Sequence, residues 1–166
     1  MTQSTPPATL REPARRVSRK APLLWTLTAL LQGCAGAAVL VFVAYAWQLF
    51  EMPWWGWICY VVAALLYAAT MPAVRYRVHR WEATEDAVYT QAGWLTRERR
   101  IAPMSRVQTV DLEQGPIGRL VGLAEVTVTT ASAAGPVRIE GLDYPVAARL
   151  VDELTRRTSA VAGDAT

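Results

Sequence analysis

The residue types that most often carry catalysis are sparse in this sequence. It has one histidine, His79, and its two cysteines, Cys34 and Cys59, both lie in long apolar runs. No histidine or cysteine pair outside those runs has zinc-ligand spacing. The sequence also lacks a Gly-x-Ser-x-Gly elbow and a phosphate-binding Gly-Lys loop. We therefore expect that the protein is not an enzyme, and we predict no catalytic, cofactor-binding or metal-binding residue.

The histidine itself is expected on the surface of a strand. Apolar and polar residues alternate across residues 74–79, which is the pattern of a half-buried strand. The neighbouring Arg77 and Arg80 disfavour the cationic form of His79.

Binding is the remaining class of function, and arginines are the candidates for it. They follow either the second apolar run or the turn at Gly93, and they can face anionic lipid headgroups or a partner. The candidates are Arg75, Arg77, Arg80, Arg97, Arg99, Arg100 and Arg106. The alternative is that these arginines are solvated and pair with Glu82, Glu98 or Glu113, which would contribute under about 1 kcal/mol each. From Arg75 onward acids balance bases, so we predict no nucleic-acid binding.

Two charge-free runs predict a transmembrane hairpin over residues 21–74. Charges are absent from Ala21 to Phe50 and from Met52 to Val74, although the whole chain carries 17 basic and 14 acidic residues. A helix needs about 20 apolar residues to cross the bilayer core. The expected helices cover residues 23–50 and 54–71, and the short link between them forces an antiparallel pair.

Flanking bases predict the orientation of the hairpin. Lysine and arginine precede the first helix and follow the second, while the link has none, so both termini are expected in the cytoplasm. The rival interpretation is a cleavable signal peptide ending at Ala44-Tyr45-Ala46. The apolar run before this site exceeds the usual length of about 7–15 residues, which favours an uncleaved anchor. Residues 1–20 are basic and proline-rich, and we expect them to be disordered.

Residues 75–158 have the pattern of a small β-domain with a helix at its end. Short runs such as 110–113, 125–129 and 137–140 alternate with period two, and turn residues separate them. From Pro145 the apolar spacing becomes helical. We predict an antiparallel sandwich or barrel capped by this helix, followed by a disordered tail at residues 159–166.

One segment between two predicted strands supplies a family resemblance. Glycine and proline there supply the backbone angles that a turn needs. A structural role is therefore favoured for Gln114, Gly115, Pro116, Arg119, Leu120, Gly122 and Leu123. Together with Arg106–Val110 and Val126–Val128, this segment resembles the second bacterial pleckstrin-homology-like (PH-like) family. The two preceding spans are similar to its small YdbS-like membrane proteins.

The resemblance implies a fold and a kind of partner. The implied fold has two near-orthogonal antiparallel sheets and a C-terminal helix, after a two-helix transmembrane hairpin. YdbS-like proteins often accompany a larger membrane protein with repeated domains of this type. In eukaryotic PH domains a basic loop between the first two strands holds phosphoinositides, but the corresponding residues here, Thr84-Glu85-Asp86, are acidic.

Three functions remain open from the sequence. The first is an interaction or scaffold module at the cytoplasmic face of the plasma membrane, which binds protein partners or assembles with itself. The second is binding of anionic lipid headgroups at the inner leaflet. The third is an accessory subunit of an export or envelope-defence complex.

Overall fold

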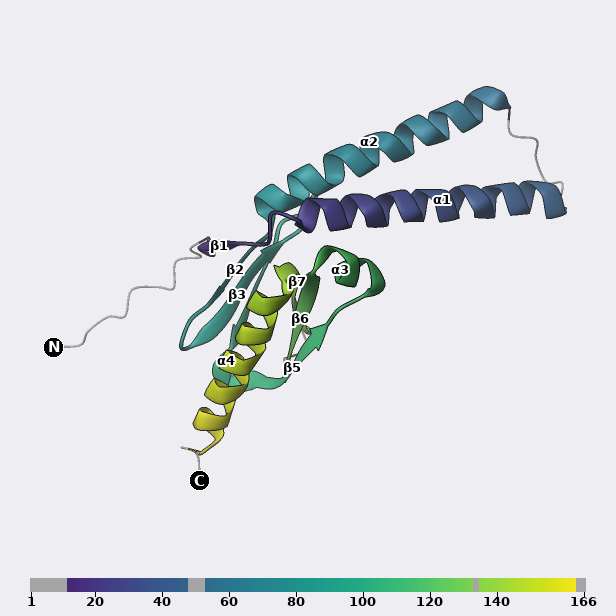
Figure 1. The fold of residues 1–166 in the computed structure, drawn as a ribbon. Coiled ribbons are helices and arrows are strands. Elements are labelled where there is room, and N and C mark those ends of the chain that lie inside the picture. Colours follow the sequence, from purple (N-terminus) through teal and green to yellow (C-terminus); the bar gives the residue numbers. More distant parts are fainter. Residues whose placement is uncertain (1–11, 48–52, 133–134, 164–166) are drawn as a thin grey trace.

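The computed structural model describes residues 12–47, 53–132 and 135–163. Two long helices lead into a domain of two antiparallel sheets, and a C-terminal helix lies along the domain (Figure 1). This architecture confirms the expected fold class. The outer link between the helices falls at residues 48–52, outside the described residues.

The helices of the hairpin are long, apolar and mostly uncovered. Helix α1 spans Ala21–Trp47 and α2 spans Trp54–Val78. Each helix is long and apolar enough to cross a membrane. Only 6% of an apolar 18-residue window is buried in α1, and only 17% of the corresponding window in α2. Helices in the core of a soluble domain would be covered on most sides. The exposed apolar surface therefore fits a lipid environment. Cys34 and Cys59 are free thiols on this surface.

The domain begins with a four-stranded sheet in the order β1-β2-β3-β4. Its strands are β1 (Arg15–Arg16), β2 (Arg80–Ala83), β3 (Ala87–Ala92) and β4 (Glu98–Pro103). A 3-10 turn, η1 (Met104–Arg106), then leads to a three-stranded sheet in the order β5-β6-β7. Its strands are β5 (Val107–Glu113), β6 (Leu123–Thr130) and β7 (Val137–Asp143), with the short helix α3 (Pro116–Val121) between β5 and β6.

Helix α4 (Tyr144–Gly163) completes the core by packing against the second sheet. Its buried residues Ala147, Leu150 and Leu154 recur at helical spacing and join Val126, Val128 and Ile139 in one cluster. The predicted period-two runs are confirmed as β5, β6 and β7. The expected disorder of residues 159–166 is wrong for residues 159–163, which belong to α4. Residues 164–166 lie outside the described residues.

The first expected strand was wrong. Residues 74–78 belong to α2, which continues to Val78, and β2 starts only at Arg80. Extending an existing helix adds one hydrogen bond per residue fixed, so a brief period-two alternation does not stop it. His79 ends the helix and is buried rather than exposed on a strand.

The expected disorder of residues 1–20 was wrong for the part that the structure describes. Arg15 and Arg16 pair with Trp81 and Arg80 as β1, and Val17 is buried in the main core. The backbone of residues 15–16 needs only the free edge of β2 to satisfy its hydrogen bonds. Residues 1–11 lie outside the described residues.

Candidate functional site at the junction of hairpin and domain

The first turns of α1 pack into the domain along one face. Ala21, Trp25 and Ala29 recur every four residues and are all buried, although most of α1 is exposed. The same cluster includes Ala68 and Met71 from the last turns of α2. Residues four apart share one face of a helix, so a single small-large-small stripe forms the contact. The hairpin and the domain therefore share one core.

Gly141 is the point of closest approach between β7 and α1. Its φ of 74° is left-handed, and a Cβ built on it would lie 2.7 Å from the Cβ of Ala21. The strand pairing shifts register beside it, which is how a β-bulge re-aims a strand. The Gly141 carbonyl accepts a 2.9 Å hydrogen bond from the Ser18 amide. Only glycine fits this position without strain.

Arg75 joins the end of α2 to both α1 and β7. Its guanidinium lies 4.6 Å from the centre of the Trp25 ring and 2.6 Å from Glu140 Oε2. About three-quarters of the Arg75 side chain and two-thirds of the Glu140 side chain are buried. A cation over a tryptophan face stabilises by about 0.5–1 kcal/mol at exposed sites and more when desolvated. The ion pair and the ring contact therefore orient the hairpin on the domain.

His79 is enclosed behind this ion pair. The ring is 4% exposed and lies 5.2 Å from the Trp25 ring, and no donor or acceptor among the described residues bonds to its buried Nδ1. Burial and, second, the positive charge of Arg75 lower the pKa of His79 to about 4. The ring is thus neutral at pH 7. The sequence predicted this direction from Arg77 and Arg80, but its causes are burial and then the charge of Arg75.

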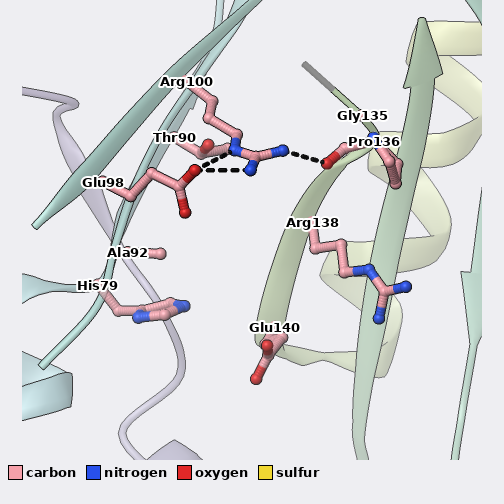
Figure 2. A pocket seen from close by; sticks show the side chains of 9 residues that line it. All are labelled: His79, Thr90, Ala92, Glu98, Arg100, Gly135, Pro136, Arg138 and Glu140. Carbon is pink, nitrogen blue, oxygen red and sulfur yellow. Dashed lines mark hydrogen bonds and ion pairs between the residues drawn. The ribbon is translucent and has the colours of Figure 1, made fainter. Parts of the chain in front are cut away.

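A polar cleft lies between the two sheets, with a volume of about 390 Å³. We call it the intersheet cleft. Figure 2 shows Thr90, Ala92, Glu98 and Arg100 on one side and Arg138 and Glu140 of β7 on the other. Arg100 bridges the two sides by bonding to Glu98 and to the Pro136 carbonyl. The lining therefore has two acids, two arginines and a neutral histidine, which is a balanced polar surface.

A second cavity of about 360 Å³ lies between α1, α3 and the second sheet. We call it the junction cavity. Leu24 and Thr28 of α1 face Ile117 and Gly118 of α3 across it, and Glu113, Glu125 and Glu140 also line it. Burial, followed by the charge of Glu140, raises the pKa of Glu125. Arg138 lies 3.7 Å from Glu125 Oε1, beyond hydrogen-bond range. Its positive charge therefore offsets only part of the rise in the pKa of Glu125.

The seven candidate arginines do not form one patch. Arg75 and Arg100 are held by Glu140 and Glu98, and Arg80 and Arg99 lie within 4 Å of Glu12. The pairing with Glu98 is one of the alternatives predicted from the sequence. Within the described ranges no ion pair involves Arg77, Arg97 or Arg106, and all three are exposed. Arg77, Arg97 and Arg106 remain candidates to face lipid or a partner.

The family segment is structural at most but not all of its positions. Leu123 is fully buried, Gly122 ends α3 with a φ of 75°, and Gln114 bonds to the Leu123 carbonyl. Leu120 is different because it is 88% exposed. The structural role expected of Leu120 therefore stays a prediction.

The residues that build the junction were not selected from the sequence. No sequence pattern assigned Glu140 or Gly141 to a site. An isolated glycine inside a strand pattern indicates a bulge or a close backbone approach, so Gly141 was open to detection. Among the described residues, no group of histidine, cysteine, aspartate and glutamate is arranged to hold a metal ion.

Comparisons with known proteins agree with this geometry. The family profile described as Bacterial PH domain matches residues 26–158, which include most of the hairpin and the domain. The chain is similar to the UPF0699 transmembrane protein YdbS of Bacillus subtilis (strain 168). The two are 29% identical over 150 residues, which cover 87% of this chain and 92% of that protein. No solved structure matches the chain.

Proposed function

Because the chain belongs to the bacterial PH domain family, with a membrane hairpin built into its core, we propose that it is a membrane-anchored interaction module. The module binds protein partners at the cytoplasmic face of the bacterial plasma membrane. The observation that supports this proposal is the close packing of Ala21 and Trp25 of α1 on Gly141 of β7, because it fixes the domain relative to the hairpin.

The intersheet cleft is the partner-facing site of this module. Polar groups of both signs line it, and polypeptides with mixed charges offer complementary groups. A partner would replace the solvent around Arg138, whose side chain is 61% exposed. The expected partner is a membrane protein with related PH-like domains, as the family resemblance implies, and a second copy of this chain is the alternative.

The cytoplasmic placement rests on the distribution of bases. Arg19 and Lys20 precede α1, and Arg75 and Arg77 end α2, so all four bases lie at the domain end of the hairpin. Bases are enriched in the cytoplasmic flanks of membrane helices. Both termini and the domain would then lie in the cytoplasm.

Photocrosslinking in cells tests the partner. A benzoylphenylalanine at Arg138 is expected to give protein adducts, while the same group at the exposed Asp152 of α4 is the matched control. Mass spectrometry of the adducts identifies either a related membrane protein or a second copy of the chain, and both outcomes support the proposal. Adducts to lipid alone, or equal protein adducts at both positions, would contradict it.

A further inference from the structure

The turn between β3 and β4 reaches back to the membrane-spanning part of α2. Its Trp94 packs edge-to-face on Tyr67 of α2, with ring centres 5.6 Å apart. The following residue, Leu95, is 77% exposed although it is large and apolar. The turn is tight, because a Cβ on Gly93 would lie 1.8 Å from the Thr96 carbonyl oxygen, and Gly93 has a φ of 121°.

The position of Tyr67 along α2 sets the depth of this turn. Tyr67 lies 11 residues before the end of α2 at Val78, or about 16 Å along the helix axis. The whole helix is about 37 Å long, whereas the hydrocarbon core is about 30 Å thick. The domain end of α2 thus projects only about 7 Å beyond the core when Trp54 marks the outer boundary. Tyr67 then lies within the bilayer, and Trp94 lies beside it.

Helix α3 occupies an equivalent place beside α1. Ile117 and Gly118 face Leu24 and Thr28 across the junction cavity, so α3 lies alongside the first two turns of α1 (Figure 1). Leu120 of α3 is 88% exposed at this level. The two most exposed leucines of the domain therefore lie on elements that flank the spanning helices.

We propose that the β3–β4 turn and α3 form a second membrane contact, in which Trp94, Leu95 and Leu120 enter the inner leaflet of the bilayer. The occupant of this apolar surface is the lipid of the same membrane, because the surface continues the lipid-facing surface of the hairpin through Tyr67. Tryptophan is enriched near the membrane–water interface of each leaflet. The exposed Arg97 follows the turn, where a base faces anionic headgroups. This inference requires only that the hairpin spans a membrane, and it is independent of the proposed partner.

Spin-label accessibility in lipid vesicles tests the contact on the full chain. With Cys34 and Cys59 replaced by alanine, single labels are placed by Leu95→Cys, Leu120→Cys and, as a control, Ser105→Cys. Ser105 is exposed in η1, at the opposite end of β4 from the turn and about 20 Å away. All three positions are exposed, so the substitutions leave the core intact.

The labels at positions 95 and 120 are expected to collide several-fold more with oxygen, relative to a water-soluble nickel chelate, than the label at 105. Equal nickel access at all three positions in vesicles would overturn the proposal. Shielding of positions 95 and 120 that occurs only in native membranes, and not in pure lipid vesicles, would assign the surface to a protein and would also overturn it.

Discussion

Replacing Gly141 by valine is expected to release the hairpin from the domain. A side chain at this position must adopt a left-handed backbone, at a cost of about 1–2 kcal/mol, and its Cβ would meet Ala21 at 2.7 Å. Overpacking adds about 1–3 kcal/mol. The sum of about 2–5 kcal/mol is smaller than the roughly 5–15 kcal/mol that stabilises a native domain, so the contact between β7 and α1 should open while the domain stays folded.

Distances between two spin labels measure this release directly. In the cysteine-free chain, one label at Leu31 reports the hairpin and one at Ser105 reports the domain, since both positions are exposed. The unaltered junction should give one narrow distance distribution, and Gly141→Val should broaden it. Gly115→Ala is the matched control, because a Cβ there meets nothing within 4 Å. An unchanged distribution in Gly141→Val would show that the junction does not fix the domain.

His79 is expected to make the protein less stable in acid, starting well above the pH at which most carboxylates titrate. Its pKa is lowered from 6.5 in the unfolded chain to about 4 in the folded one. The unfolded state therefore binds more protons between these values, and the free energy of unfolding falls as pH decreases from 6.5 to 4. The total loss of unfolding free energy is about 3 kcal/mol, because each unit of difference between the two pKa values contributes about 1.4 kcal/mol.

The comparison variant is His79→Phe, which keeps a ring against Trp25 but cannot titrate. Its unfolding free energy should lose the histidine-dependent slope between pH 6.5 and 4. Glu125 acts in the opposite sense, because its raised pKa favours the folded state as pH falls, and it is present in both proteins. Since His79 is the single histidine, its ring resonance in NMR spectra gives the pKa directly. A midpoint near 6.5 would refute the burial of a neutral ring.

The sequence was sufficient for the parts of the fold that repeat a simple pattern. Long charge-free runs predicted both helices of the hairpin, because a bilayer requires length and apolarity more than specific residues. Alternation at Val126 and Val128 predicted β6, since each of these residues is fully buried and its neighbours are not. The helical spacing of Leu150 and Leu154 predicted α4 for the same reason.

The remaining parts depend on contacts between segments far apart in the chain. Arg15 and Arg16 form β1 only because β2 offers a free edge more than 60 residues later. His79 is buried only because α1 brings Trp25 against it. The alternation of residues 74–78 is too short to show whether a strand begins or a helix continues.

The candidate site was harder to predict than the fold. The arginines were selected for their charge, but ion pairs with Glu140, Glu98 and Glu12 engage four of them. The sequence predicted Glu98 as a partner, whereas no local pattern revealed Glu140 or Glu12. A structural role is predicted for Leu120 because it lies in a segment with the glycines and proline of a turn, yet its side chain is exposed. The proposed contact with the bilayer beside α1 would account for this exposure.

The central claim is that the hairpin holds the PH-like domain at the cytoplasmic face of the membrane, and the sidedness of the C-terminus tests it most directly. Alkaline phosphatase and green fluorescent protein are each fused after Thr166 and expressed in bacterial cells. The first folds to an active enzyme only outside the cytoplasm, and the second fluoresces only inside. The expected result is a fluorescent green fluorescent protein fusion and an inactive phosphatase fusion at equal expression. An active phosphatase with no fluorescence would contradict it.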